Sequence, residues 1–376
     1  MKIVYCIAGT YNSGGMERVL ANKANWFARQ GYDVTIITTE QKGREPFFSL
    51  DKRIVCHDLG IGYEENNGGT FLNKVLHYPF KQYRHRKRLT KLLEEIKPDI
   101  TVSMFCNDVS FLPKIKDGSK KVLEIHFSKF KRLQYARKGL WRLADIYRNK
   151  REEQQVRSFD RFIVLTEEDK GYWGNLPNIG VIPNARTFNP TTIATLDTCR
   201  IVAIGRYTHQ KGFERLIEAW NNICRQHPHW KLDIIGEGEE QPKLQALIDH
   251  YNIAESTTLC PPTNNMDAVY RSAAIIAMSS RYEGLPMIML EAQAYGIPIV
   301  AFNCKCGPMD IITDGINGYL VDEGNCEKLA QKLATLIEDD KLRAQMGKEA
   351  HINSSRYSEE NIMRMWTTLF QQLKGE

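Results

Sequence analysis

The chain begins with alternating apolar strands and amphipathic helices. Residues 3–7 form a short apolar run that is typical of a buried strand, and a second such run occupies residues 33–39. Between them, apolar side chains recur at helical spacing on one face: Met16, Val19, Leu20 and Phe27. Further apolar runs predict strands at residues 99–104, 121–125 and 161–165. Strands that alternate with helices in this way indicate a parallel, doubly wound α/β sheet.

The same alternation starts again near residue 200. Apolar runs predict further strands at residues 201–204, 231–235, 274–278 and 297–302. Helical patterns lie at residues 213–224, 242–251 and 287–295, with more helices from residue 326 onward. A Pro/Asn-rich connector at residues 181–190 separates the two series. We therefore predict two doubly wound domains, 1–185 and 195–356, that face each other across a ligand-binding cleft.

Length and composition agree with this organisation. A chain of 376 residues exceeds one ordinary core, and 42% hydrophobic with 26% charged residues is typical of a soluble globular protein. No apolar run is long enough to span a bilayer, and the run at the N-terminus is too short for a signal peptide. The nine cysteines show neither an even framework nor zinc-site spacing, so we expect incidental thiols in a cytoplasmic protein.

One stretch of the second series combines two acids with the start of a helix. Pro286 is tolerated in a first helical turn, so Glu283 should lie just before the helix and Glu291 inside it. Unpaired N–H groups at a helix start favour anions, especially phosphate. Either acid alone could be an ordinary surface residue, but the pair is more specific. Carboxylates that accept hydroxyl hydrogen bonds beside a phosphate site suit a nucleotide sugar.

A second cluster follows the first strand of this series. It consists of Gly205, Arg206, Lys211 and Gly212. An Arg and a Lys in one loop can close on a diphosphate from two sides, Arg through a forked contact and Lys as a point charge. A solvated charged loop is the alternative. The flanking glycines and the position after a buried strand favour the functional interpretation.

Three more signals lie at predicted strand ends. Gly14 and Gly15 let the backbone approach a phosphate closely, although they lack the G-x-G-x-x-G fingerprint of nicotinamide or flavin sites. Gly236 and Gly238 could admit a base or ribose, with a simple turn into a helix as the competing interpretation. His126 is a candidate because it follows the strand at 121–125. The histidines without such a context are expected to be exposed: His57, His77 and His85.

Taken in order, these clusters make the chain similar to family 4 of the retaining glycosyltransferases, which have the GT-B fold of two Rossmann-like domains. Seven motifs carry the resemblance over nearly the whole length, at residues 14–15, 126, 182–184, 205–212, 236–238, 280–298 and 314–321. The opening motif and residues 306–312 look most like the branch that builds bacterial exopolysaccharide, capsule or lipid-linked oligosaccharide. Residues 185–186 and Asp310 depart from the common pattern without removing a donor-binding group.

The resemblance implies a role for each cluster. Arg206 and Lys211 would hold the donor diphosphate and stabilise the leaving nucleotide. Glu291 would bind ribose, Glu283 the sugar hydroxyls, and His126 the sugar itself. The catalytic set implied in this way is His126, Arg206, Lys211 and Glu283. The donor-binding set is Gly14, Gly15, Gly205, Arg206, Lys211, Gly236, Gly238, Pro262, Glu283, Gly284, Leu285, Pro286, Met287 and Glu291.

The resemblance also implies the substrates. The donor would be a nucleotide sugar, with UDP-sugars favoured over GDP-mannose, and the acceptor a glycan or a lipid-linked glycan. Retention at the transferred carbon and independence from metal or other cofactors follow from the family. A helix at residues 357–376 would complete the first domain, with one buried face formed by Ile362, Met365, Trp366 and Phe370. Another GT-B enzyme, such as an epimerase or phosphorylase, and a non-catalytic partner subunit are the alternatives.

The net charge of +6 is concentrated in two segments of the first half. Residues 74–91 carry seven basic side chains and no acid, and residues 129–151 carry nine against Asp145 alone. Aromatic residues are interleaved with both. Solvated helix faces are the simplest interpretation, but with the polysaccharide resemblance we favour peripheral contact with a membrane surface or a lipid-linked acceptor. We expect no nucleic acid, because no recognised binding module accompanies the charge.

Overall fold

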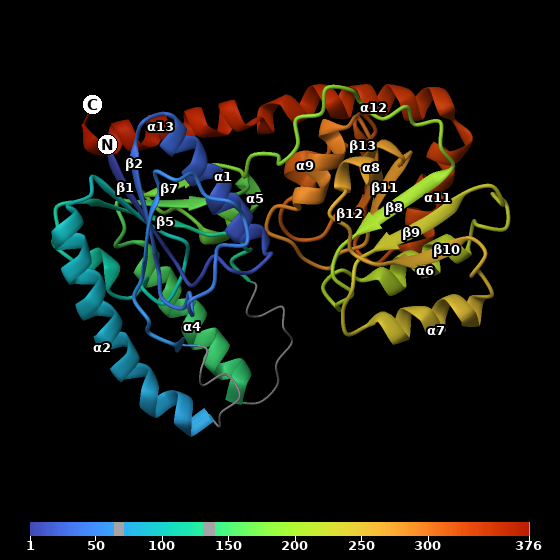
Figure 1. Cartoon of the computed structure of the whole chain (residues 1–376). Coiled ribbons are helices and arrows are strands. Elements are labelled where there is room, and N and C mark those ends of the chain that lie inside the picture. The colour runs from blue at the N-terminus through green and yellow to red at the C-terminus, as the bar shows by residue number, and fades with distance from the viewer. Residues whose placement is uncertain (64–70, 131–139, 376) are drawn as a thin grey trace. The chain divides into compact units, whose positions relative to one another are not determined.

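The structure of the protein is a computed structural model that describes residues 1–63, 71–130 and 140–375 (Figure 1). These residues form two compact units. The first comprises the described residues of Met1–Leu165, Asp169–Ile182 and Met363–Glu376, and the second comprises Thr166–Glu168 and Pro183–Ile362. Each unit is built on a parallel sheet, as the alternation of strands and helices predicts.

In the first unit, the described residues form a seven-stranded sheet in the order β3-β2-β1-β4-β5-β6-β7. Every neighbouring pair of strands is parallel. The order reverses between β1 and β4, because the chain builds outward from β1 in one direction and then from β4 in the other. The strands are β1 (Lys2–Ile7), β2 (Asp33–Thr38), β3 (Val55–Asp58), β4 (Ile100–Ser103), β5 (Lys120–Glu124), β6 (Arg161–Val164) and β7 (Ile179–Val181).

Helices of the first unit cover the sheet with their apolar faces. Leu20, Ala24 and Phe27 on α1 are fully buried, which matches the predicted helical stripe. The helices are α1 (Gly15–Arg29), α2 (Phe71–Ile96), η2 (Leu112–Lys114), α4 (Leu140–Val156) and α5 (Glu167–Trp173). The last helix of the chain, α13 (Glu359–Lys374), belongs to this unit from Met363 onward.

The second unit has a six-stranded parallel sheet in the order β10-β9-β8-β11-β12-β13. Its strands are β8 (Arg200–Ile204), β9 (Lys231–Ile235), β10 (Thr257–Cys260), β11 (Ile275–Met278), β12 (Ile299–Phe302) and β13 (Gly318–Val321). Its helices are α6 (Phe213–Asn221), α7 (Gln241–Tyr251), α8 (Met266–Arg271), α9 (Met287–Ala294), α10 (Pro308–Ile311), α11 (Cys326–Glu338), α12 (Asp340–Ser354) and η3 (Ser355–Tyr357).

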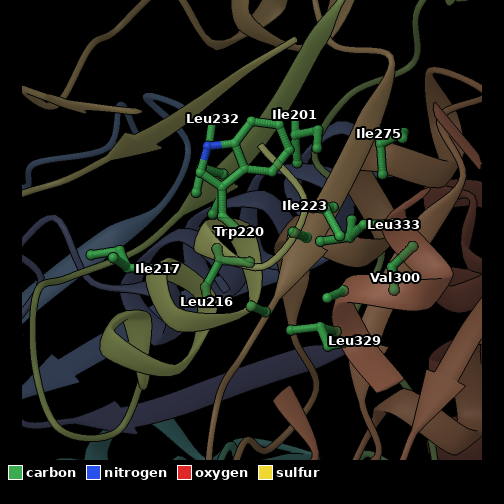
Figure 2. Close-up of a cluster of buried hydrophobic side chains, with 14 of the residues drawn as sticks. Ile201, Leu216, Ile217, Trp220, Ile223, Leu232, Ile275, Val300, Leu329 and Leu333 are labelled. Carbon is green, nitrogen blue, oxygen red and sulfur yellow. The ribbon is translucent and has the colours of Figure 1, made fainter. Parts of the chain in front are cut away.

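The core of the second unit forms where α6 and α11 pack on the sheet. Trp220 on α6 is fully buried beside Ile201 and Leu232 of neighbouring strands (Figure 2). Leu329 and Leu333 on α11 lie in the same cluster. Most polar residues of the candidate site lie in loops that follow the strands of this sheet.

The sequence patterns did not predict the short strands β3 and β7. All four side chains of β3 are exposed, so this strand has no apolar alternation to detect. The three residues of β7 are half-buried, and only Val181 falls inside the connector predicted at residues 181–190. Both strands lie at edges of their sheet, and backbone pairing there does not require a hydrophobic sequence.

Two predictions about individual side chains were wrong. His85 is 2% exposed rather than exposed, because the α2 face that carries it packs inward with Leu89 and Leu93. Burial lowers the pKa of His85 to about 4. Met365 is 41% exposed, although it was placed on the buried face of α13. One residue turns a helix by about 100°, so a face centred on Trp366 leaves Met365 at the side. His57 and His77 are exposed, as expected.

Candidate active site

The candidate site of the second unit lies where the strand order of its sheet reverses. β8 and β11 are neighbours in the sheet, but the chain continues from them in opposite directions, to β9 and to β12. Loops that leave the carboxyl ends of two such strands diverge, and open α/β sheets commonly bind ligands there. The loop after β8 spans residues 205–212, and the loop after β11 spans residues 279–286. These loops carry most of the predicted phosphate-binding and sugar-binding side chains.

The structure brings Lys211 and Glu283 together. Lys211 Nζ lies 2.8 Å from Glu283 Oε1, and the two side chains are 17% and 9% exposed. The alkyl chain of Lys211 crosses the backbone at Gly205, where an added Cβ would lie 2.9 Å from Lys211 Cε. Gly205 therefore leaves the space through which Lys211 reaches Glu283. The pair joins the loop after β8 to the loop after β11.

Arg206 is in a different situation from Lys211. Its side chain is exposed, and its guanidinium makes no hydrogen bond or ion pair with the described residues. A guanidinium without a protein partner keeps its forked donors for an anion, and phosphate matches their geometry. The loop after β8 therefore presents one cation held by an acid and one that is uncommitted.

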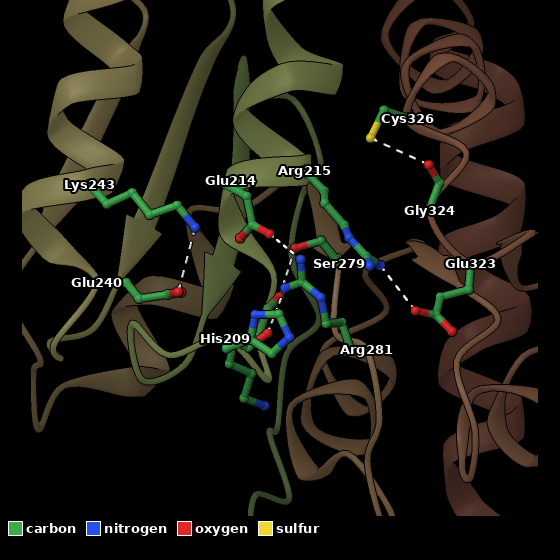
Figure 3. Close-up of polar contacts among 11 residues, drawn as sticks. His209, Glu214, Arg215, Glu240, Lys243, Ser279, Arg281, Glu323, Gly324 and Cys326 are labelled. Atoms are coloured by element: carbon green, nitrogen blue, oxygen red, sulfur yellow. Dashed lines mark hydrogen bonds and ion pairs between the residues drawn. The ribbon is translucent and has the colours of Figure 1, made fainter. Parts of the chain in front are cut away.

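A network around Arg281 fixes these two loops to each other. Arg281 donates from Nη1 to the carbonyl oxygen of His209 at 2.6 Å and pairs through Nη2 with Glu214 (Figure 3). Ser279 Oγ donates to the carbonyl oxygen of Lys211 at 3.0 Å. Burial raises the pKa of Glu214, but the hydrogen bond from Arg281, a backbone hydrogen bond and nearby positive charges together outweigh it, and the pKa falls below its usual value. Two residues of the loop after β11, Ser279 and Arg281, thus hold the backbone that carries Lys211.

Gly236 and Gly238 let the loop after β9 pack against the loop after β8. A Cβ on Gly236 would lie 1.9 Å from the carbonyl oxygen of Gly205, and a Cβ on Gly238 would lie 2.5 Å from that of Tyr207. Tyr207 also donates its backbone N–H to the carbonyl of Glu237 at 2.8 Å. The glycines therefore have a structural role between two loops of the protein. Their contact with a base or ribose stays a prediction.

Residues 283–286 lead into α9. Pro286 is the N-cap of the helix, one position earlier than its predicted place in the first turn, and no side chain caps α9. Gly284 is half-buried and Leu285 is buried. Uncapped N–H groups in a first helical turn are the donors that a phosphate would use. The start of α9 at Met287 is therefore compatible with the predicted anion contact.

Glu291 points into the unit rather than toward open solvent. It is 5% exposed, and its Oε2 accepts a hydrogen bond from the hydroxyl of Tyr270 at 2.6 Å. The ring of Tyr270 stacks on Tyr295 with 5.1 Å between ring centres. The hydroxyl of Tyr295 in turn donates to Asp267 Oδ1 at 2.6 Å. An ordered tyrosine pair thus fixes the orientation of the Glu291 carboxylate.

Sequence reasoning missed the residues that support this site. Arg281 lies two positions before Glu283, within the motif at residues 280–298. This position could have marked it as part of the site. Tyr270 had none, because nothing in the sequence relates α8 to Glu291 on α9. Pro262, in contrast, was predicted, and it lies exposed in the loop after β10. The structure pairs Lys211 with Glu283, whereas it shows no comparable contact for Pro262 within the described residues.

Gly14, Gly15 and His126 belong to the first unit. Gly14 is the N-cap of α1, and no side chain caps this helix. A Cβ on Gly15 would meet no atom within 4 Å, so the backbone there borders open space. His126 is the second residue after β5, and its Nε2 lies 3.2 Å from Glu124 Oε1. Glu124 carries no signal in the sequence, and its carboxylate lies beside the His126 ring.

In the described part of the chain, no helix combines the length and the apolar character that a membrane crossing requires. No three His, Cys, Asp or Glu side chains come together there as a possible metal site. Independence from metal remains a prediction.

Comparisons with known proteins match both halves of the chain. Residues 13–186 match the family described as Glycosyltransferase Family 4, and residues 194–352 match Glycosyl transferases group 1. An uncharacterized glycosyltransferase of Haemophilus influenzae is 32% identical over 372 residues, covering 97% of this chain and 98% of the relative. The amylovoran biosynthesis glycosyltransferase AmsD of Erwinia amylovora is 31% identical over 391 residues, covering 98% and 99%.

Solved structures agree on the fold. The pneumococcal O-GlcNAc transferase GtfA, in complex with UDP and GlcNAc, superposes with a TM-score of 0.76 at 14% identity, covering 100% of this chain and 99% of that chain. Two parallel-sheet, Rossmann-like domains are the architecture of the GT-B glycosyltransferases. The sequence matches go further than the fold: the chain belongs to the family 4 glycosyltransferases.

Proposed function

We propose that the protein transfers a sugar from a nucleotide-sugar donor, preferably a UDP-sugar, to a glycan or lipid-linked acceptor during synthesis of a bacterial surface polysaccharide. The observation that carries this proposal is the loop after β8. It presents the uncommitted guanidinium of Arg206 and the ammonium of Lys211, which pairs with Glu283 and is 17% exposed, at the point where the strand order reverses. The AmsD relative, named for amylovoran biosynthesis, supports the polysaccharide setting.

The proposed chemistry is a displacement at the anomeric carbon. The bond from that carbon to the β-phosphate oxygen breaks, the acceptor oxygen forms a new bond to it and loses its proton, and the nucleoside diphosphate leaves. Arg206, Lys211 and the start of α9 would stabilise the charge that grows on the departing phosphate. Glu283 and Glu291 would bind sugar and ribose hydroxyls, and His126 would contact the sugar. We propose that the configuration at the anomeric carbon is retained.

Nucleotide binding can be tested before any acceptor is known. In a thermal-shift panel of UDP, GDP, ADP and their sugars, we expect UDP and UDP-sugars to raise the melting temperature most, as the UDP complex of GtfA suggests. A shift with GDP and GDP-mannose alone would favour a mannosyltransferase. Stabilisation by none of these compounds would contradict the transferase proposal.

Two matched arginine variants test whether the guanidinium of Arg206 binds the nucleotide. Arg206→Ala should abolish most of the UDP-induced shift while leaving the melting temperature of the free protein unchanged. Arg225→Ala is the control, because Arg225 is equally exposed but follows the C-terminal end of α6, at the other edge of the sheet. Equal loss of the shift in both variants would indicate a general effect of charge.

Metal independence has a direct assay. Two side-chain cations and a helix start can supply the charge that a divalent ion supplies elsewhere. We therefore expect sugar transfer to persist in EDTA at the rate measured with added Mg²⁺ or Mn²⁺. Loss of transfer in EDTA, with recovery on adding metal, would contradict this part of the proposal.

A basic and aromatic face of α2 supports contact with a membrane surface or a lipid-linked acceptor. Phe80 and Tyr83 are 66% and 65% exposed. Exposed basic residues continue the same outward face along the helix: Arg84, Lys87 and Lys91. The second basic segment contributes less, because Lys129 already pairs with Glu153 at 2.8 Å. Its residues 131–139 lie outside the described part of the chain.

Vesicle sedimentation tests this contact. Each basic residue near an anionic surface contributes about 1 kcal/mol, so Phe80→Ala/Lys87→Ala should weaken binding to phosphatidylglycerol vesicles by roughly tenfold. Phe47→Ala/Lys52→Ala is the matched control, because Phe47 is also exposed, at 57%, outside α2. No binding of the unmodified protein to anionic vesicles, or equal effects of both variants, would exclude this face.

A further inference from the structure

His126 and Glu124 lie two positions apart at the end of β5. The side chains of a strand alternate between its faces, so positions 124 and 126 lie on the same side. His126 Nε2 lies 3.2 Å from Glu124 Oε1, and the two side chains are 6% and 1% exposed. Neither ring nitrogen of His126 makes a hydrogen bond of good geometry with the described residues. The ring is nearly buried, with its Nε2 beside the Glu124 carboxylate and its Nδ1 without a hydrogen-bond partner among the described residues.

Lys23 on α1 holds the same carboxylate. Lys23 Nζ lies 2.5 Å from Glu124 Oε1 and 2.6 Å from Oε2, and both side chains are almost fully buried. The ammonium also lies 3.8 Å from the centre of the Trp366 ring on α13. Contacts to both oxygens fix the plane of the carboxylate, and burial strengthens them. Lys23 thus links Glu124 on β5 to α1 and, through the Trp366 ring, to α13.

Three titratable groups face the Glu124 carboxylate: Lys23, His126 and the hydroxyl of Tyr5 on β1. Burial would raise the pKa of Glu124, but the charges of Lys23 and His126 outweigh it and lower the pKa to about 2. Burial together with the charge of Glu124 raises the pKa of Tyr5. Near neutral pH the carboxyl is therefore ionised and the tyrosine is not.

We propose that Glu124 is a positioning residue for His126, a carboxylate held in place by Lys23 that orients the imidazole ring. This inference rests on the proposed function, in which His126 contacts the transferred sugar. A carboxylate beside Nε2 favours the ring state with a proton on that nitrogen, which leaves Nδ1 for the sugar. A purely structural ion pair would instead tie α1 to β5 without acting on His126.

A double-mutant cycle separates these two roles. Glu124→Gln should lower kcat for sugar transfer by roughly 10- to 100-fold, as loss of an orienting partner commonly does, with little change in the donor KM. The same change made in His126→Ala should lower kcat by less than about twofold, because the ring it orients is gone. Equal factors in both backgrounds would show that Glu124 acts independently of His126 and would overturn the inference.

Stability needs its own control, because Glu124→Gln leaves the Lys23 ammonium buried without its partner. The double variant Lys23→Met/Glu124→Gln removes both charges and should fold, as judged by circular dichroism and an unchanged UDP-induced thermal shift. It should still show the loss of kcat. Recovery of full activity in this neutral pair would overturn the inference.

A second buried pair on the same strand provides the matched control. Lys121 and Asp117 form an ion pair with side chains 4% and 0% exposed, at the start of β5 rather than at its end. Lys121→Met/Asp117→Asn removes equivalent charges three residues from Glu124 along the strand. We expect this variant to keep kcat within about twofold of the unmodified protein, even where it loses stability. A loss equal to that of Lys23→Met/Glu124→Gln would attribute the effect to general destabilisation and overturn the inference.

Ring-nitrogen NMR of His126 supplies a readout that needs no donor. Glu124→Gln should shift the Nδ1 and Nε2 signals of His126, whereas Lys121→Met/Asp117→Asn should leave them in place. Unchanged signals in Glu124→Gln would overturn the inference even if transfer is lost. A normal rate in His126→Ala would instead refute the proposed sugar contact, and the positioning role would fall with it. Nucleotide binding by the second unit would stand as a separate result.

Discussion

The two units each contain a lysine–glutamate pair near the carboxyl ends of their strands, and the pairs differ in how closed they are. Lys23 contacts both oxygens of Glu124, and the side chains are 4% and 1% exposed. Lys211 contacts one oxygen of Glu283 at 2.8 Å, and those side chains are 17% and 9% exposed. The residue types are the same, but one pair is enclosed by protein and the other borders solvent.

The difference in exposure indicates that one ion pair is fixed and that the other can change partners. A buried pair cannot release its partner without leaving an isolated charge in a low-dielectric interior, so Lys23 and Glu124 must stay together. The pair of Lys211 and Glu283 borders solvent, so under the proposed function Lys211 would turn toward a phosphate and Glu283 toward a hydroxyl. The comparison therefore predicts that the first pair matters most for stability and the second most for activity.

Breaking the enclosed pair should have the largest effect. Lys23→Met removes the ammonium that contacts both oxygens of the buried Glu124 carboxylate and should lower the free energy of unfolding by about 3–5 kcal/mol. Lys211→Met should lower it by about 1 kcal/mol or less, because solvent screens the acid that remains. Urea unfolding followed by circular dichroism measures both. Similar losses in the two variants would contradict the distinction between an enclosed and an open pair.

Activity should show the opposite order. Under the proposed function, Lys211→Met removes a cation from the departing phosphate and should lower the transfer rate by about 10²- to 10³-fold, or roughly 3–4 kcal/mol of barrier. Lys243→Met is the control lysine, since Lys243 lies nearby on α7 and is 55% exposed, with Glu240 at 3.6 Å (Figure 3). Rates in both variants within a factor of two of the unmodified protein would remove Lys211 from the site.

Acid should break the ion pair between Lys23 and Glu124 only at low pH. The pKa of Glu124 is about 2 in the folded protein, below its usual value, so its stabilisation is present above about pH 4.5 and is lost as the pH falls toward 2. Over that range, the free energy of unfolding should fall more in the unmodified protein than in Lys23→Met/Glu124→Gln. Parallel curves from pH 7 to pH 2.5 would contradict the lowered pKa.

The fold followed from sequence because its signal is local. The apolar run at residues 3–7 and the helical stripe through Leu20 and Phe27 each report burial directly, and both are confirmed. β3 was missed because its side chains are all exposed and only its backbone pairs. A strand whose side chains are all exposed leaves no such local pattern in the sequence.

The site was predictable only in part, because its supporting contacts are remote in sequence. Gly205 and Lys211 were found as neighbours in one loop, and the pairing of Lys211 with Glu283 joins residues 72 positions apart. Lys23 and Glu124 are separated by 101 positions, and nothing in either neighbourhood indicates the other. From sequence alone, a single lysine on an amphipathic helix is predicted to be exposed to solvent. Only the tertiary structure shows that Lys23 is buried.

Glu291 offers the mildest test, because it is a buried acid held by a neutral partner. Tyr270→Phe removes the hydroxyl that donates to Glu291 at 2.6 Å and should lower the free energy of unfolding by about 1.5–2 kcal/mol. It should also weaken UDP binding if Glu291 accepts from ribose. Tyr295→Phe is the control, since that hydroxyl donates to Asp267 instead, at 2.6 Å. Equal weakening of UDP binding by both variants would show that the tyrosine pair acts through packing rather than through the Glu291 carboxylate.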